Sequence, residues 1–577
     1  MLKKLASCVG EYKRDSILAP LFVTCEVILE VIIPWLMAYI IDKGIEKGNM
    51  NVVFGIGIAL ILLGGLSMLC GAMSGRYAAS ASAGFAKNMR KKMFYSVQDF
   101  SFSNIDRFST SGLITRLTTD VSNLQNAYQM IIRIAVRCPA MLIFSLSMAF
   151  FVNPKIALIF LAIIPFLGGG LILIASKAHP IFEKVFKTYD RLNRVVQENL
   201  RGMRVVKAFV REDHEEDKFK TVSKEIYDKF CSAERLLSFN APLMQTSMYI
   251  CMLLIAWFGS KLILSSSMTQ GELISMITYA NQILMSLMNF SMIFVMVIIS
   301  KASAERIAEV LSEETDLSDG ERNLTAVKDG SIVFEDVSFS YSKNLDALCL
   351  KHIDISIASG ETIGIIGGTG SAKSSLVQLI PRLYDATAGR VLVGGEDVRD
   401  YNIEALRSSV AMVLQKNELF SGTIKDNLRW GKEDATDEEI INACRMAQAD
   451  EFIQTFPDKY DTHIEQGGKN VSGGQKQRLC IARALLKKPK ILILDDSTSA
   501  VDTATDRLIR KAFAEDIPNT TKIIIAQRVS SIQHADRILV MENGEINAFG
   551  THAELLETNQ IYREIYQSQQ REVKDNE

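Results

Sequence analysis

Long apolar stretches dominate the first half of the chain, whereas the second half alternates short apolar runs with polar turns. A helix needs about 20 mostly apolar residues to cross the hydrocarbon core of a bilayer. Six stretches meet this requirement, at residues 16–41, 52–73, 127–152, 156–174, 244–264 and 273–299. The connections after the first, third and fifth stretches are short, while the other two are long and charged. We therefore predict an all-α membrane domain of six helices with two large excursions on one side.

Positive charge gathers in and near the two excursions. Residues 76–116 and 177–235 are rich in Lys and Arg, whereas the short connections hold little beyond Lys43, Lys47 and Lys155. Lys and Arg accumulate on the cytoplasmic side of membrane proteins. We therefore expect a multi-pass protein of the cytoplasmic membrane with both termini in the cytoplasm. The excursions keep helical periodicity, so we expect them to continue the membrane helices as rods.

Ionisable side chains occur inside two of the predicted spans. Glu26 and Glu30 lie one helical turn apart in the first span, and Arg133 and Arg137 do the same in the third. Such groups are costly in contact with lipid, so they must face a partner or water. Two interpretations fit: ion pairs between spans, or a polar wall in a substrate path.

The last predicted span combines thioether and amide side chains. These are Met276, Met285, Met288, Met292 and Met296, together with Asn281, Gln282 and Asn289. Flexible Met surfaces suit varied small-molecule substrates. Ordinary helix packing produces the same pattern, so both interpretations stay open.

Length and charge divide the chain and narrow its partners. At 577 residues it exceeds the roughly 250–300 residues at which a single core stops growing. We predict a membrane domain at 1–310, a polar linker at 311–330 and a soluble α/β domain at 331–577. The net charge of -2 gives no basic excess, so no nucleic-acid partner is expected. The nine cysteines are scattered without metal-ligand spacing.

A phosphate-binding loop is the strongest chemical signal in the second half. An apolar strand at 361–366 leads into a glycine-rich loop and then a helical pattern at 376–383. Backbone N–H groups of such a loop and of the following helix N-terminus face an anion. We expect Lys373 to reach the β- and γ-phosphates of ATP and Ser374 to bind Mg²⁺. The predicted ATP-binding residues of the loop are Gly367, Gly368, Thr369, Gly370, Ser371, Ala372, Lys373, Ser374 and Ser375.

Two further motifs follow the loop. An apolar strand at 491–495 ends in Asp495, the arrangement in which a carboxylate holds Mg²⁺. Just upstream, a Ser-Gly-Gly-Gln sequence precedes a helical pattern at 477–486 and so presents N–H groups to an anion. Its residues are Ser472, Gly473, Gly474 and Gln475. This run resembles the signature of ABC proteins, with Val471 in place of Leu.

With six apolar spans before them, these motifs resemble the ABC exporter family over nearly the whole chain. The resemblance implies a six-helix transmembrane domain fused to an α/β P-loop ABC ATPase domain. It also implies that Tyr341 stacks on adenine, that Gln415 contacts Mg²⁺, and that Asp502 belongs to the D-loop, with Ser499 and Ala500 before it.

The same resemblance implies an ATP-driven exporter of an amphipathic or lipid-like small molecule, as in multidrug exporters. The family's coupling helices, which contact ATP-binding domains, would lie near 104–111 and 204–209. Two half-transporters pair head to tail in this family. Each ATP site then combines the Walker motifs of one subunit with the signature of the other.

Three positions depart from the family pattern, and all belong to the site of this chain's own Walker motifs. Ala372 replaces Gly, Asp496 replaces the Glu that activates water, and Gln527 replaces the switch His. General-base catalysis needs distances of about 2.6–3.2 Å, which the shorter Asp side chain does not reach. Gln carries no charge near neutral pH. We expect a degenerate site with slow hydrolysis and a second, unlike half-transporter that supplies Glu and His. A homodimer with two slow sites and an ATP-gated regulator remain alternatives.

Overall fold

The computed structural model describes residues 2–496 and 501–575. The chain forms two compact units: Met1–Asp99 with Phe108–Glu313, and Phe100–Arg107 with Glu314–Glu577. The predicted domain boundaries at 310 and 331 stay a prediction.

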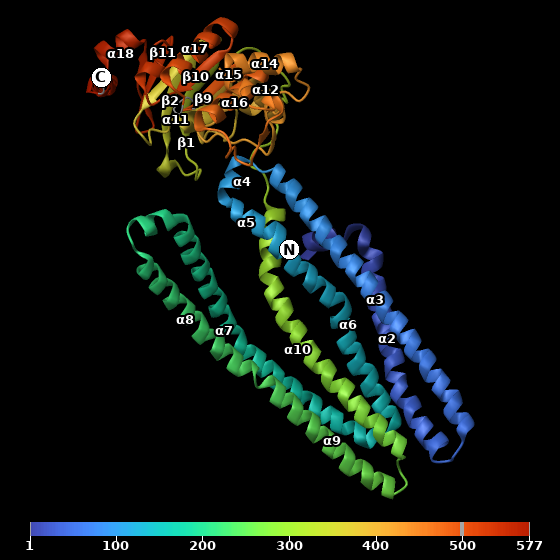
Figure 1. Ribbon diagram of the computed structural model, residues 1–577. Helices are drawn as coiled ribbons and strands as arrows, with labels where there is room; N and C mark the ends of the chain where they lie inside the picture. Colours follow the sequence, from blue (N-terminus) through green and yellow to red (C-terminus); the bar gives the residue numbers. More distant parts are fainter. Residues whose placement is uncertain (1, 497–500, 576–577) are drawn as a thin grey trace. The chain divides into compact units, whose positions relative to one another are not determined.

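The first unit is a bundle of long helices, which confirms the all-α expectation (Figure 1). Its longer helices are α2 (Lys13–Tyr39), α3 (Met50–Gln98), α6 (Val121–Val152), α7 (Pro154–Ala208), α8 (Glu212–Leu237), α9 (Asn240–Leu264) and α10 (Gln270–Ser312). Its shorter segments are α1 (Leu2–Ala6), η1 (Ser7–Tyr12), η2 (Ile40–Ile45), α5 (Thr110–Thr115) and η3 (Arg116–Asp120). Within the described residues, five helical stretches are long and apolar enough to cross a membrane. The sixth predicted span, 273–299, lies inside α10.

Helix length explains the long excursions. The helix α3 has 49 residues and α7 has 55. At 1.5 Å per residue they measure about 70 and 80 Å, against ~30 Å of hydrocarbon core, so both must extend beyond it. The second excursion turns at Val210, whose φ of 51° is left-handed. Because α7 ends at Ala208 and α8 begins at Glu212, the segment predicted as a coupling helix near 204–209 is the end of α7 rather than a separate helix.

The helices of the first unit pack around a buried apolar core that contains a few polar bridges. Val31 of α2, Phe160 of α7 and Ile255 of α9 belong to it and are almost fully buried. Tyr279 of α10 is also buried, and its hydroxyl donates to the carbonyl oxygen of Val31 at 2.9 Å. Close packing and hydrogen bonds of this kind hold helices together in lipid, where apolar surroundings provide no hydrophobic driving force.

The second unit is an α/β domain with three sheets. Their strand orders are β2-β1-β4-β5, β12-β11-β3-β10-β9-β6 and β7-β8. The strands are β1 (Ile332–Phe339), β2 (Leu350–Ile357), β3 (Thr362–Gly367), β4 (Ala388–Val393), β5 (Glu396–Asp397), β6 (Val410–Val413), β7 (Gly422–Thr423), β8 (His463–Ile464), β9 (Ile491–Asp495), β10 (Thr521–Ile525), β11 (Arg537–Glu542) and β12 (Glu545–Gly550). The helices are α4 (Phe102–Arg107), α11 (Lys373–Gln378), α12 (Ile403–Ser409), α13 (Ile424–Arg429), α14 (Asp437–Met446), α15 (Asp450–Gln454), α16 (Gly473–Leu486), α17 (Thr503–Asp516), α18 (His552–Thr558) and α19 (Gln560–Asp575).

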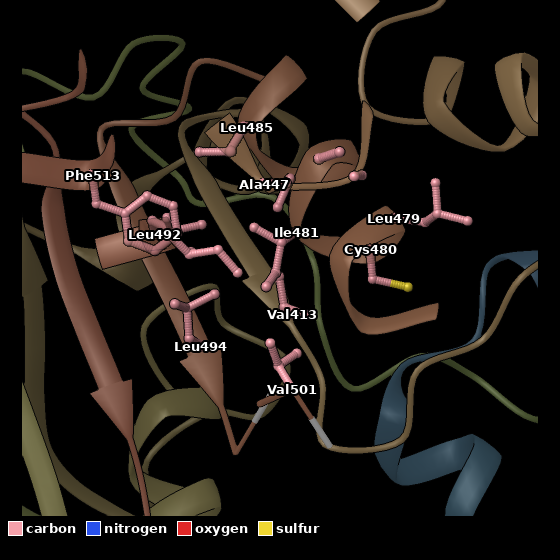
Figure 2. Close-up of a cluster of buried hydrophobic side chains, with 14 of the residues drawn as sticks. Val413, Ala447, Leu479, Cys480, Ile481, Leu485, Leu492, Leu494, Val501 and Phe513 are labelled. Atoms are coloured by element: carbon pink, nitrogen blue, oxygen red, sulfur yellow. The ribbon is translucent and has the colours of Figure 1, made fainter. Parts of the chain in front are cut away.

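The six-stranded sheet is buried on both faces, which explains its unbroken apolar strands. Neighbours from β11 to β6 pair in parallel, and β12 pairs antiparallel with β11. Alternate side chains of a strand point to opposite faces. Accordingly, Leu492 and Leu494 of β9 belong to the cluster drawn in Figure 2, with Ile481 of α16 and Phe513 of α17. Ile493, between them, belongs to the cluster on the other face.

Two predicted helices differ at their ends from the sequence pattern. The helix predicted at 376–383 is α11, which begins at Lys373 and ends at Gln378. The chain cannot continue it far, because Pro381 follows and proline lacks the N–H that a helix requires. The helix predicted at 477–486 begins four residues earlier, directly after Ser472, whose side chain caps it.

The short helix α4 lies in the region predicted for the first coupling helix and packs within the second unit (Figure 1). Tyr384 donates from its hydroxyl to Asp106 Oδ2 at 2.6 Å, and the rings of Tyr384 and Phe102 lie 6.0 Å apart. Ser103 donates to Asp316 Oδ2 at 2.7 Å. Burial alone would raise the pKa of Asp316, but hydrogen bonds from Lys343 and from serines of the α4 segment hold it at about 2. The α4 segment is therefore anchored through aromatic and charged contacts.

Candidate ATP-binding site

Four of the predicted motifs meet at one edge of the six-stranded sheet. The glycine-rich loop follows β3, Gln527 follows β10, Asp495 ends β9, and Gln415 follows β6. These strands are consecutive neighbours and run in parallel, so their carboxyl ends lie at the same edge. In open α/β sheets, ligands bind at this edge. The sheet order thus brings together motifs that are more than a hundred residues apart in the chain.

Two positions of the glycine-rich loop favour glycine. Gly370 has a φ of 84°, in the region that glycine adopts readily. At Gly367, an added Cβ would lie 2.2 Å from the carbonyl oxygen of Met541 in β11, so only glycine fits beside the neighbouring strand. The Nζ of Lys373 donates to the carbonyl oxygens of Gly367 and Gly368 at 2.9 and 2.8 Å. Burial lowers the pKa of Lys373, while nearby carboxylates oppose that shift.

Ala372 occupies the position where the loop pattern has glycine, and its backbone is left-handed. Its φ and ψ are 66° and 24°. An L-residue adopts this conformation at a cost of roughly 1–2 kcal/mol that glycine does not incur. Ala372 therefore introduces local backbone strain next to Lys373.

Two of the three residues predicted to bind Mg²⁺, Ser374 and Asp495, lie beside each other. Ser374 Oγ donates to Asp495 Oδ1 at 3.0 Å. Burial raises the pKa of Asp495. A hydroxyl and a carboxylate beside a phosphate cradle fit Mg²⁺, which prefers oxygen ligands and usually keeps substrate oxygens and waters in its remaining positions.

Two of the three departures from the family pattern, Asp496 and Gln527, are bonded to each other. Gln527 Nε2 donates to Asp496 Oδ2 at 2.7 Å. The Gln415 side chain also bonds to Asp496 and, like Gln527, lowers its pKa, but burial outweighs both and raises it overall. The backbone of Asp496 is left-handed, with a φ of 47°, which Asp tolerates better than most residues. Two side-chain amides thus bond to the Asp496 carboxylate.

Tyr341, which the resemblance predicts to stack on adenine, lies beside Ser375 at the end of the glycine-rich loop. Its hydroxyl is 2.9 Å from Ser375 Oγ, and its side chain is half exposed. Its ring lies 4.9 Å from that of Phe339 and 5.2 Å from that of Tyr384, both edge-on. Sequence reasoning missed Tyr384, since a lone tyrosine after α11 has no motif around it. Only the fold places it between Tyr341 and α4.

The signature residues form a regular helix start. Ser472 Oγ accepts from the N–H of Gln475 at 3.3 Å, and Gln475 Oε1 accepts from the N–H of Ser472 at 2.9 Å. This capping box fixes the first turn of α16, which Gly473 and Gly474 open. Asp502 caps α17 by accepting from the N–H of Thr505 at 2.9 Å. The predicted D-loop residues Ser499 and Ala500 lie outside the described residues.

A cavity lined by both polar and apolar side chains lies between α6 and α10 of the first unit. Arg137 of α6 pairs with Glu26 and Glu30 of α2 at 2.5 and 2.7 Å, which confirms ion pairing between these predicted spans. A cavity of about 280 Å³ adjoins the same arginine. It is also lined by Met285 of α10 and by the three amide residues predicted from the last span, Asn281, Gln282 and Asn289. The methionines of the last predicted span do not share one environment. Met276 is buried in the core, whereas Met288 and Met292 are exposed.

The chain is similar to known proteins over nearly its whole length. Residues 16–287 match the ABC transporter transmembrane region, and residues 350–499 match the ABC transporter family. The chain is 39% identical over 571 residues to the uncharacterized ABC transporter ATP-binding protein YfiB of Bacillus subtilis, with 98% of each chain covered. It is 34% identical over 484 residues to the ATP-dependent lipid A-core flippase of Desulfotalea psychrophila, with 84% of each covered.

A solved structure is similar over the same length. It is that of a bacterial Atm1-family ABC exporter with ATP bound, with a TM-score of 0.82 and 22% sequence identity. The match covers 97% of this chain and 99% of that chain. The likeness shows that the two chains share a fold.

Proposed function

This chain belongs to the ABC transporter family as an exporter half-transporter, with a membrane domain fused to an ATP-binding domain, and we propose that it acts as one subunit of a heterodimer. The proposed pump uses ATP to move an amphipathic or lipid-like small molecule across the cytoplasmic membrane, with both termini in the cytoplasm. This chain's Walker motifs form a degenerate ATP site, and its signature completes the site of an unlike partner. The observation that carries the proposal is the hydrogen bond between Gln527 and Asp496.

This pair suits the holding of ATP better than its hydrolysis. A general base must turn an oxygen toward the attacking water, within about 2.6–3.2 Å. The Asp496 side chain is one methylene shorter than that of Glu. Its carboxylate bonds to Gln527 and Gln415 rather than being free to accept from the attacking water. A side-chain amide also cannot become a cation near the γ-phosphate, so the developing charge loses a possible stabiliser. Loss of general-base catalysis lowers a rate by about 10²–10⁴-fold, and we expect a deficit of that order at this site.

ATP binding itself depends on groups that this chain retains. Lys373 and the N–H groups of the loop would hold the phosphates, and Ser374 and Asp495 would hold Mg²⁺. When bound, Mg²⁺ neutralises phosphate charge. Tyr341 offers a ring face for adenine. We therefore expect tight binding with slow turnover.

The signature supports an unlike partner. The capping box between Ser472 and Gln475 gives α16 a well-formed N-terminus, where N–H groups and the helix dipole favour an anion. Such a signature can serve an active site in the opposite subunit. A partner that supplies Glu and His beside its own Walker motifs would therefore hydrolyse ATP rapidly.

The mixed lining of the cavity between α6 and α10 supports an amphipathic substrate. Its amide groups can bond to a polar head, while Met285 and the surrounding apolar helices accommodate hydrocarbon. The lipid A-core flippase among the relatives acts on a molecule of this kind. The coupling step would pass through α4, which is anchored by Tyr384.

Two alternatives make different predictions. A homodimer with two slow sites needs no partner and shows the same slow hydrolysis in every preparation. An ATP-gated regulator closes on ATP without moving substrate. Reconstitution of the chain alone, and together with each unlike half-transporter of the same organism, followed by ATPase and lipid- or dye-transport assays in vesicles, separates the three.

Substitution tests the degenerate site directly. In the heterodimer, Asp496→Glu combined with Gln527→His should raise hydrolysis at this site by at least about tenfold, because both catalytic groups are restored. Asp434→Glu, at an exposed position, is the matched control and should leave the rate unchanged. The proposal fails if the chain alone hydrolyses ATP as fast as any mixture, or if the double variant is no faster than the control.

A further inference from the structure

The C-terminal helix holds the main chain of the switch segment through one side chain. Gln569 of α19 donates from Nε2 to the carbonyl oxygen of Gln527 at 2.8 Å. Its Oε1 accepts from the N–H of Val529, also at 2.8 Å. These contacts lie on either side of Arg528, so one amide clamps the backbone of the segment that carries the switch residue.

Few side chains can make this pair of bonds. The clamp needs a donor and an acceptor a short distance apart, and a side-chain amide provides both. A carboxylate could accept from the N–H of Val529 but would oppose the carbonyl of Gln527. An alanine would leave both backbone groups without these partners. The chemistry therefore selects Gln at 569 rather than any polar residue.

The helix that carries the clamp is itself anchored in the core. Tyr562 of α19 is fully buried, and its hydroxyl lies 2.7 Å from Nδ1 of His552 in α18. Asn559 accepts from the N–H of Tyr562 at 2.8 Å and so fixes the start of the helix. Tyr562 and Val529 belong to the same buried cluster. A displacement of α19 would therefore move the backbone at 527–529.

Gln527 joins this clamp to the site. Its carbonyl oxygen is held by Gln569, and its side chain bonds to Asp496. The direction of the Gln527 side chain depends on the orientation of its own backbone. The position of α19 is thus linked, through one residue, to the group expected to face the γ-phosphate.

We propose that Gln569 is a positioning residue for the degenerate ATP site, and that α19 sets how long this site retains ATP by fixing the switch segment. The proposal rests on the proposed function, since it requires that the site bind ATP. It adds a control point outside the Walker, signature and switch motifs. Any factor that shifts α19 would then change nucleotide retention without touching the nucleotide.

The test measures the dissociation of Mg²⁺-ATP from the full-length chain in lipid nanodiscs, by rapid filtration with radiolabelled ATP. Gln569→Ala removes both hydrogen bonds of the clamp and should accelerate dissociation by about fivefold, a change of the size that one ordinary hydrogen bond contributes. Gln569→Glu should do at least as much, because it cannot donate. Gln570→Ala is the matched control: Gln570 is exposed on the same helix, donates to the hydroxyl of Tyr566 one turn away, and should leave the rate unchanged.

A double-variant cycle separates positioning from general stability. If Gln569 acts through the switch residue, adding Gln569→Ala to Gln527→Ala should produce little further change in dissociation. Additive effects, an equal effect of Gln570→Ala, or unchanged dissociation in both Gln569 variants would overturn the inference. Lys373→Ala tests the premise separately. If ATP binding survives that change, the proposed ATP site fails, whereas Lys373-dependent binding with unaffected Gln569 variants refutes only the clamp.

Discussion

Removal of one hydroxyl from Tyr384 should loosen the α4 segment while leaving its aromatic packing in place. The hydroxyl donates to Asp106 Oδ2 at 2.6 Å, a short distance typical of a bond to a charged acceptor. Tyr384→Phe removes that bond but keeps the ring beside Phe102, Phe339 and Tyr341. The substitution therefore isolates a single interaction between α4 and the rest of its unit.

The expected effect of Tyr384→Phe on the attachment of α4 depends on how exposed Asp106 is to solvent. A hydrogen bond to a charged group contributes about 1.5–3 kcal/mol, and solvent competes for one whose acceptor is exposed, as Asp106 is. We therefore expect the substitution to weaken the attachment of α4 by about 1 kcal/mol, which corresponds to a roughly fivefold increase in the population with α4 detached. Ser103 and Phe102 keep their own contacts with the unit, so detachment should remain a minor state.

Hydrogen–deuterium exchange measures this population. Peptides that cover residues 100–107 should exchange about fivefold faster in Tyr384→Phe than in the unsubstituted chain. The matched control is Tyr460→Phe, which removes a tyrosine–aspartate bond of 2.7 Å to Asp450 elsewhere in the same unit. It should leave exchange at 100–107 unchanged. Equal exchange in all three proteins, or an equal effect of the control, would refute the anchoring role of Tyr384.

Three further predictions concern the glycine-rich loop and the helical unit. Gly367→Ala should abolish ATP binding, because the added Cβ would lie 2.2 Å from a carbonyl oxygen of β11. Gly368→Ala is the control and should not clash, because nothing lies within 4 Å of its added Cβ. Equilibrium measurements of ATP binding distinguish the two variants. Ala372→Gly should change the unfolding free energy by less than about 1 kcal/mol in a thermal melt, because relief of backbone strain is offset by the greater freedom of the unfolded chain. A larger change would contradict this offset between strain and chain freedom. Arg137→Ala should destabilise the detergent-solubilised chain by about 1–3 kcal/mol, because two carboxylates of α2 lose their cation. The control is Arg133→Ala, at a similarly half-buried position of α6. An equal loss of stability in both variants would contradict the role of the ion pairs.

Much of the ATP site was predictable because its signals are local. The glycine-rich loop needs particular backbone angles within a few residues, and Asp495 ends an apolar strand whose burial on both faces is evident from its composition. Parallel strands bring such loops to one edge, so the grouping of the glycine-rich loop with Asp495 and Gln527 followed from the fold class.

The remaining features depend on contacts between distant segments. Nothing near Gln569 distinguishes it from the other glutamines of a polar, C-terminal helix, and its partner Gln527 lies 42 residues earlier. Tyr384 likewise gains its role from Asp106, 278 residues away. The pairing of Arg137 with Glu26 and Glu30, rather than of Arg133, depends on the rotation of α6 against α2. Sequence periodicity alone does not determine that rotation.

The membership of α4 in the second unit affects how this protein can be dissected. The chain passes between the two units three times, after Asp99, after Arg107 and after Glu313. A fragment that starts at residue 314 would therefore be missing an eight-residue piece of its own surface, with the Tyr384 ring and hydroxyl left exposed. Expression of that fragment alone would yield the second unit without its α4 segment. A fragment that includes residues 100–107 by fusion would keep the partners of Tyr384 and Asp316 in this segment.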